Sequence, residues 1–141
     1  MGDLFKIVNN FRGLKSELPN LAIDVLDESD ILIMQDRLEQ GIYADGSSFP
    51  EYSETTIGIK RSTGGFISQS GNIALKDSGD FYDSMNLKKF KGFAEIDAAD
   101  PDGLNERFGS NILDVSQDES NEMFEIKREQ LLKNVEKYLF E

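Results

Sequence analysis

The N-terminal part of the chain has the spacing of amphipathic helices. Between residues 2 and 18, apolar residues follow one another at intervals of three and four, which predicts a helix (Leu4, Ile7, Val8, Phe11, Leu14 and Leu18). Pro19 predicts that this helix ends at residue 18, because the residue before a proline disfavours helical backbone. Asn20 would then cap a second helix that runs to about residue 40, where Gly41 is a natural stop.

The stretch from residue 41 to residue 80 lacks this periodicity. It contains seven glycines and seven serines, and the pairs Asp45-Gly46 and Phe49-Pro50 predict turns. Residues 55–59 (Thr-Thr-Ile-Gly-Ile) predict a short strand because they are rich in β-branched side chains. We expect residues 41–72 to form an extended, partly flexible loop or arm. A loop of that length in a compact domain is usually functional or flexible.

Two short runs in the second half predict a β-hairpin. Residues 85–90 and 93–96 are separated by Lys91-Gly92, a favourable hairpin turn. Phe90, Ala94 and Ile96 would share the buried face of this hairpin.

Ser116 and Glu119 form a capping box at the start of a helix that we expect to run almost to the C-terminus. The order helix, helix, long loop, hairpin, helix predicts an α+β fold. We expect a single domain over residues 1–141, with a small antiparallel sheet packed by two N-terminal helices and one C-terminal helix.

The balance of charges is strongly acidic. With 15 Lys and Arg against 27 Asp and Glu, the net charge is −12. Affinity for nucleic acids comes mainly from Lys and Arg that neutralise phosphates, so this composition argues against a nucleic-acid-binding protein. The chain has no apolar stretch long enough to span a bilayer, and its N-terminus lacks the features of a signal peptide, so we expect a soluble protein.

Two absent residue types narrow the chemistry further. The chain has no Cys and no His, which excludes disulfides, thiolate and imidazole catalysis, and metal sites that use these ligands. Asp97, Asp100 and Asp102 precede Gly103, as in a calcium-binding turn. The acidic residues that an EF-hand would need at positions 98 and 109 are Ala and Gly, so we expect no metal and no cofactor.

A two-carboxylate hydrolase is the enzyme class that the composition still allows. Glu51 with Glu54, or Asp77 with Asp80, would be the candidate pairs, but the sequence does not place either pair across a cleft. Residues 62–65 (Ser-Thr-Gly-Gly) lack the lysine and the spacing of a phosphate-binding loop. We therefore expect a protein that is not an enzyme.

The acidic helical faces leave three interpretations open. They can be ordinary solvated surfaces, a surface that lets DNA slide past because like charges repel, or a DNA mimic that binds a nucleic-acid enzyme. Charge alone does not separate these alternatives.

Three blocks of the sequence follow a pattern known from a protein family. Residues 38–53 read Leu-Glu-Gln-Gly-Ile-Tyr-Ala-Asp-Gly-Ser-Ser-Phe-Pro-Glu-Tyr-Ser, and Thr55, Thr56 and Lys60 follow. Residues 75–85 read Leu-Lys-Asp-Ser-Gly-Asp-Phe-Tyr-Asp-Ser-Met, and residues 108–119 read Phe-Gly-Ser-Asn-Ile-Leu-Asp-Val-Ser-Gln-Asp-Glu. In order and type, these blocks resemble the virion-morphogenesis proteins of tailed phages, which are small neck and tail-completion proteins. The resemblance covers about 100 residues, from 38 to 139.

This resemblance implies a non-enzymatic virion structural protein of a phage or prophage, assembled in the cytoplasm of a bacterial host. It would join head and tail by self-association into a ring and by docking to other neck or tail proteins, with neither a membrane nor a specific nucleic-acid sequence as partner. We expect aromatic and basic residues of two blocks and the loop at these contacts (Phe49, Pro50, Tyr52, Lys60, Arg61, Phe66, Phe81 and Tyr82). Core packing is the alternative for Phe49, Pro50, Tyr52 and Phe81. If the basic pair Lys60-Arg61 meets an acidic neighbour, raised salt should weaken subunit association.

Overall fold

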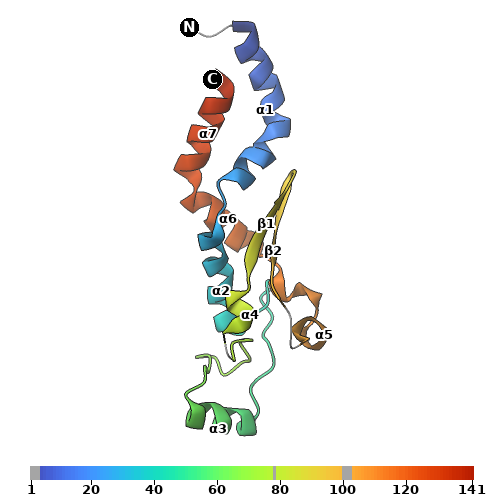
Figure 1. Cartoon of the computed structure of the whole chain (residues 1–141), viewed down its shortest axis with the longest axis vertical. Coiled ribbons are helices and arrows are strands. Elements are labelled where there is room, and N and C mark those ends of the chain that lie inside the picture. Colours follow the sequence, from blue (N-terminus) through green and yellow to red (C-terminus); the bar gives the residue numbers. More distant parts are fainter. Residues whose placement is uncertain (1–3, 78, 100–102) are drawn as a thin grey trace.

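The computed structural model describes residues 4–77, 79–99 and 103–141 of an elongated α+β protein (Figure 1). Helices α1 (Leu4–Asp24) and α7 (Arg128–Phe140) lie side by side at one end and form what we call the stalk. Residues 25–127, which we call the body, contain the sheet and the core, with α3 (Glu54–Thr63) at the end opposite the stalk. The predicted fold class is confirmed.

Helix α1 continues through Pro19, so the predicted break at residue 18 is wrong. A proline inside a helix removes one backbone hydrogen bond, and this cost is offset here because the last turn buries Ile23. Asn20 is consequently inside α1 and caps no helix. Its side-chain oxygen instead accepts a hydrogen bond of 2.7 Å from the backbone N–H of Gly92 in the hairpin turn.

The expected second helix begins later than the sequence predicts. After α1, a short 3-10 helix η1 (Glu28–Asp30) leads into α2 (Ile31–Glu39). Asp27 and Asp30 form a capping box at η1. The capping box interrupts the helix where one continuous helix was predicted. Gly41 follows α2 with a φ of +71°, so the predicted helix stop is confirmed.

The core of the body is formed around α2. Its members are apolar and nearly all come from α2, the 49–85 region and the segment before α6 (Ile31, Met34, Leu38, Phe49, Leu75, Phe81, Tyr82, Met85 and Ile112). Phe49 is 2% exposed, and its ring stacks on Tyr43 at a centroid distance of 4.0 Å. The edge of Phe108 completes this aromatic cluster at 5.7 Å from Phe49. The 41–72 region is therefore anchored in the core at Phe49.

The strand predicted for residues 55–59 is wrong, because these residues belong to helix α3. Ser53 caps the helix: its hydroxyl accepts a 3.1 Å hydrogen bond from the N–H of Thr56. Gly64 ends the helix in the left-handed conformation, with a φ of +74°. These two caps are local signals that outweigh the β-propensity of Thr and Ile.

The predicted hairpin is confirmed as β1 (Asn86–Phe90) and β2 (Phe93–Asp97). Phe90 lies opposite Phe93, so the two rings stack at 4.8 Å, and both are about half exposed on the outer face. The prediction that Phe90 shares a buried face with Ala94 and Ile96 is wrong. Alternation along the strands places Ala94 and Ile96 on the inner face with Leu87.

Four helical segments flank or follow the hairpin: α4 (Asp80–Asp83), α5 (Leu104–Phe108), the 3-10 helix η2 (Ser110–Leu113) and α6 (Gln117–Ile126). The predicted capping box of Ser116 and Glu119 is confirmed at the start of α6. The expected single C-terminal helix is broken at Lys127, which separates α6 from α7. Among the described residues, no helix has the length and apolar character needed to cross a lipid bilayer.

An ion-pair cluster lies where the body meets the stalk, at the helix breaks that follow α1 and precede α7. The Lys127 ammonium lies 2.8 Å from a carboxylate oxygen of Asp27 and 3.7 Å from one of Asp30. The hydrogen bond from Lys127 is the main cause that lowers the pKa of Asp27 to about 2, and the same bond raises the pKa of Lys127. Lys127, at the break between α6 and α7, therefore contacts the break between α1 and α2.

Candidate functional site

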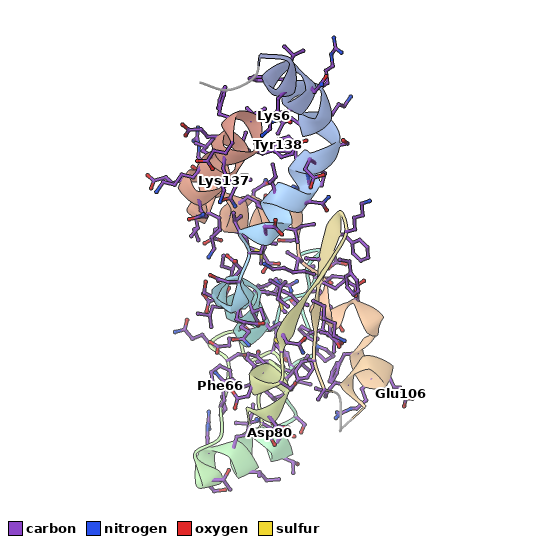
Figure 2. All side chains as sticks on the ribbon, turned by 45° about the horizontal axis from the view of Figure 1, so that its top comes forward. Lys6, Phe66, Asp80, Glu106, Lys137 and Tyr138 are labelled. Carbon is purple, nitrogen blue, oxygen red and sulfur yellow. The ribbon has the colours of Figure 1, made fainter. Side chains whose placement is uncertain are left out.

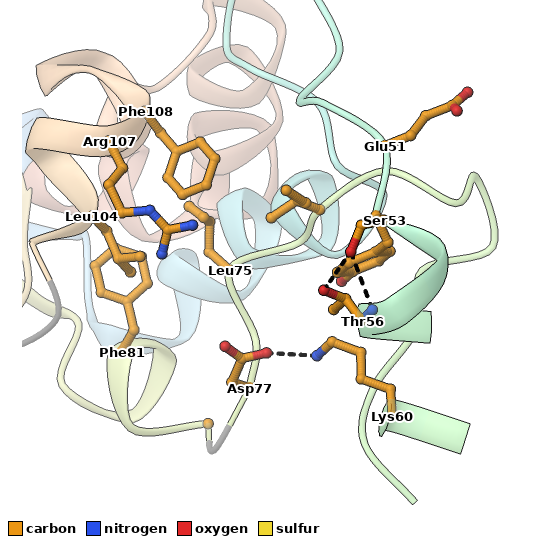
Figure 3. Close-up of a pocket in the computed structure, with 13 residues that line it drawn as sticks. Glu51, Ser53, Thr56, Lys60, Leu75, Asp77, Phe81, Leu104, Arg107 and Phe108 are labelled. Carbon is orange, nitrogen blue, oxygen red and sulfur yellow. Dashed lines mark hydrogen bonds and ion pairs between the residues drawn. The ribbon is translucent and has the colours of Figure 1, made fainter. Parts of the chain in front are cut away.

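A cavity of about 380 Å³ opens between α3, the 73–79 segment and α5 (Figure 3). One wall is polar and comes mainly from the start of α3 and the chain next to it (Glu51, Ser53, Thr56, Lys60 and Asp77). The other wall is largely apolar and comes from the core and α5 (Ile73, Leu75, Phe81, Leu104 and Phe108). Three of the predicted contact residues, Tyr52, Lys60 and Phe81, are brought together here.

Lys60 is the central cation of the polar wall, and it is already paired. Its ammonium lies 2.5 Å from a carboxylate oxygen of Asp77 and 5.2 Å from the ring centroid of Tyr52. The Lys60 side chain is 8% exposed, whereas that of Asp77 is 91% exposed. The lysine therefore links α3 to the segment that contains Asp77, whereas Arg61, the other member of the basic pair, is exposed. A contact of Lys60 with a neighbouring subunit stays a prediction.

The apolar wall contains one residue with an unusual backbone conformation and one arginine that stacks on an aromatic ring. Leu75 is buried and has a φ of +58°, a backbone conformation that is costly for a residue with a branched side chain. The guanidinium of Arg107 lies 5.1 Å from the ring centroid of Phe108 at the mouth of the cavity. Arg107 is exposed, so the cavity has a cation at its edge beside an apolar surface.

Ala74, beside the cavity, is fixed by two tyrosines. The hydroxyl of Tyr82 donates a 2.5 Å hydrogen bond to the Ala74 carbonyl, and the Ala74 N–H donates to the hydroxyl of Tyr52 at 3.1 Å. Burial raises the pKa of Tyr82 far above its ordinary value, so this hydroxyl stays protonated and remains a donor. These bonds hold Leu75, the next residue, in its unusual conformation.

The remaining predicted contact residues are distributed over several environments. Phe49, Phe81 and Tyr82 are buried in the core, so their aromatic faces are used inside the chain. Phe66 is half-buried, with the Lys76 ammonium 5.0 Å from its ring centroid.

Pro50 and Arg61 are the two predicted contact residues that are exposed. A contact role for them, and for the half-buried Tyr52 and Phe66, stays a prediction.

Of each carboxylate pair considered for catalysis, one member lines the cavity. Glu51 and Asp77 line the cavity, whereas Glu54 and Asp80 are not among its lining residues. Within the described part of the chain, no group of three or more acidic side chains is placed to hold a metal ion. Asp97 is paired with Lys88 at 2.6 Å, and Asp100 and Asp102 of the considered calcium turn lie outside the described residues.

The sequence analysis missed the exposed apolar side chains of the stalk. Val8, Phe11 and Leu18 are 41%, 52% and 41% exposed. Their spacing of three and seven residues puts them on one side of α1, with Leu14 at the edge of the same face and Asn10 farther round the helix. The apolar positions of residues 4–18 all fall on one face by their spacing, so the sequence carries no signal that separates the exposed ones from the packed ones.

The contact between the two stalk helices uses the other side of α1. The Asn10 side-chain amide donates a 2.9 Å hydrogen bond to the carbonyl of Tyr138, and the Lys6 ammonium donates to the carbonyl of Glu141 at 2.8 Å. Figure 2 shows Lys6 and Tyr138 between the two helices. Of the exposed stripe, Phe11 also contacts α7, through the edge of Phe140 at 6.0 Å, and its ring is still 52% exposed.

The chemistry of the two walls indicates what kind of group the cavity could accept. A cavity with one polar wall, one apolar wall and an arginine at its edge suits a short polypeptide segment that has an apolar side chain next to an acidic one. No family model, no curated protein and no solved structure matches this chain.

Proposed function

We propose that the protein is a non-enzymatic structural component of a phage or prophage virion that acts at the head–tail junction or the tail end. It would work by association with copies of itself and with other neck or tail proteins. The family resemblance of residues 38–53, 75–85 and 108–119 supports this proposal, since all three blocks contribute residues to the candidate cavity or to the core beside it.

The single observation that carries the proposal is the presence of two unlike surfaces on one elongated chain. The stalk exposes an apolar stripe, whereas the cavity beside α3 is partly polar. Helix α3 lies at the end of the molecule opposite the stalk (Figure 1). A ring of identical subunits uses heterologous contacts, in which different patches of neighbouring copies meet. Exposed apolar groups on a subunit typically mark such contacts.

The cavity is the candidate site for a segment of another virion protein. Its apolar wall would accept a side chain such as Leu or Phe, and Arg107 would pair with a neighbouring carboxylate. The 38–53 block supports the cavity in two ways. Phe49 anchors this part of the chain in the core, and Tyr52 and Ser53 line the cavity.

The experiment is co-sedimentation and light scattering with purified neck and tail-tube proteins of tailed phages. We expect the wild-type chain to form a defined complex with at least one of them, and Arg107→Glu to weaken it by more than about tenfold. Lys91→Glu is the matched control, because Lys91 is also exposed but lies in the hairpin turn, away from the cavity.

Two results would contradict the proposal. One is a strict monomer that binds none of these virion proteins at any concentration tested. The other is salt-sensitive capture of a basic nucleic-acid enzyme instead, which would favour an acidic DNA mimic.

A further inference from the structure

We infer that a groove at the base of the stalk is the docking site for the exposed stripe of α1 from a second copy of this chain. The inference rests on the proposed function and deepens it by naming the two surfaces through which copies associate. The groove and the stripe are both apolar and share no residue, and the stripe ends at Leu18, next to Pro19 in the lining of the groove.

The groove lies between the C-terminal half of α1, the hairpin and α6, and has a volume of about 510 Å³. Its lining is largely apolar and comes from all three elements (Pro19, Ala22, Leu26, Phe93, Met123 and Phe124). Val115 lies at the groove and is 36% exposed. A groove of this kind, bounded by helices and a sheet, suits an amphipathic helix that inserts its apolar face.

The stripe has the pattern that such a groove accepts. Val8, Phe11 and Leu18 occupy one side of α1 over almost three turns, and Phe140 of α7 extends the apolar area through an edge contact with Phe11 at 6.0 Å. Phe140 is itself 55% exposed. Anchors at intervals of three and seven residues are typical of helix-in-groove recognition.

The charges around the two surfaces are complementary. Arg12 and Lys15 border the stripe, and both are exposed. The groove is bordered by Glu95, which lines it, and by Asp114 and Asp118, which adjoin its lining residues. Basic groups beside an apolar helix face would therefore meet acidic groups beside an apolar groove.

The distribution of charge over the whole chain favours this contact over others between two copies. Helices α1 and α7 together carry six basic and four acidic side chains, a net charge of +2, whereas the rest of the chain carries nine basic and 23 acidic side chains, a net charge of −14. Two bodies therefore repel each other, and the stalk of one copy is attracted to the body of the next. Because the two patches differ, the contact is heterologous and can continue from copy to copy into a ring.

A mixing experiment tests this arrangement directly. Phe11→Asp removes the stripe but leaves the groove, and Val115→Lys alters the groove but leaves the stripe. We expect the wild type to form oligomers in sedimentation velocity, each variant alone to be monomeric, and a mixture of the two variants to form a 1:1 heterodimer. Only a heterologous contact predicts this rescue, since the intact groove of one variant receives the intact stripe of the other.

Controls keep the test independent of folding. Circular dichroism and thermal melting check that each variant folds, and Val8→Asp with Ser120→Lys forms a second stripe and groove pair should Phe11→Asp or Val115→Lys fail to fold. Ile59→Asp is the matched control, because Ile59 is 58% exposed on α3, far from both surfaces, and this variant should associate like the wild type.

The inference would be overturned by a wild type that is monomeric at all concentrations, by a mixture that stays monomeric, or by Val115→Lys that still self-associates. The last result would indicate pairing of two stripes instead. Failure here is distinguishable from failure of the proposed function: a chain that is monomeric alone but binds neck or tail proteins would refute the docking contact and leave the virion role supported.

Discussion

The body and the stalk use the same kind of side chain in opposite ways. Phe49 in the body is 2% exposed and touches aromatic rings on two sides, whereas Phe11 in the stalk is 52% exposed and has one ring contact, with Phe140. The core of the body thus buries its aromatic rings, whereas the stalk leaves Phe11 and Phe140 accessible. The residues that carry the family resemblance therefore need not be the residues that form a binding surface, because the aromatic side chains of those three sequence blocks are largely buried.

The body and the stalk also differ in net charge. The body carries almost all of the excess negative charge, and the stalk carries a small positive charge. The negative charge that argues against nucleic-acid binding therefore also restricts how copies of the chain can approach one another. Four predictions test the contrast between the regions, from the largest expected effect to the smallest.

Substitution of one phenylalanine in each region should give the largest difference in stability between the body and the stalk. Phe49→Ala should lower the free energy of unfolding by about 3–5 kcal/mol, because it leaves a cavity beside Tyr43 and Phe108. Phe11→Ala should lower it by about 0.5 kcal/mol, as for an exposed position. Urea denaturation of both variants at a concentration where the chain is monomeric measures the difference, and equal losses would contradict it.

Two glycines with similar backbone angles separate crowding from conformation within the body. A Cβ at Gly41 would lie 2.6 Å from the Cβ of Asn72, whereas a Cβ at Gly46 would meet no atom within 4 Å. Both have positive φ, so each alanine variant pays a conformational cost of about 1–2 kcal/mol. Gly41→Ala should be the more destabilising in thermal melts, and a Gly46→Ala variant that is equally destabilised would show that crowding is unimportant.

The hydroxyl of Tyr82 is expected to stabilise the segment beside the candidate cavity. Tyr82→Phe removes the donor to the buried Ala74 carbonyl and should cost about 1–3 kcal/mol. Tyr43→Phe is the control: its hydroxyl donates to the Phe108 carbonyl at 2.6 Å, but this tyrosine is half-buried and water can replace the bond. A larger loss of unfolding free energy for the Tyr43 variant would contradict this explanation.

The ion pair at the base of the stalk should give a small dependence of stability on acid. The pKa of Asp27 is lowered to about 2 from 3.8, so its contribution to stability is present above pH 3.8 and is lost as the pH falls through 2. Asp27→Asn should therefore reduce stability slightly at neutral pH, and its difference from the wild type should vanish near pH 2. Denaturation curves at several pH values measure this.

Asp118→Asn is the control for the acid experiment, since Asp118 is exposed and has no ion pair within the described part of the chain. A pH dependence that is the same for both variants would show that the Lys127 contact contributes nothing at the junction of stalk and body.

The features that the sequence predicted correctly depend on neighbours within a few residues. The turn at Lys91-Gly92 and the capping box of Ser116 and Glu119 need only local hydrogen bonds and local backbone angles. The helix at residues 54–63 has local signals of the same kind, because Ser53 and Gly64 are ordinary helix caps, but the β-branched side chains between them favour a strand.

The sequence by itself determined the class of fold, the hairpin, the main helix caps and the acidic balance of charge, because each follows from composition or from contacts over a few residues. Only the tertiary structure decided that α1 runs through Pro19, that Lys60 is buried against Asp77 and that Phe90 faces outward. It also decided which apolar residues fill the core and which stay exposed on the stalk. The physical reason is that burial is a competition for one limited interior, and its outcome depends on segments that are distant in sequence.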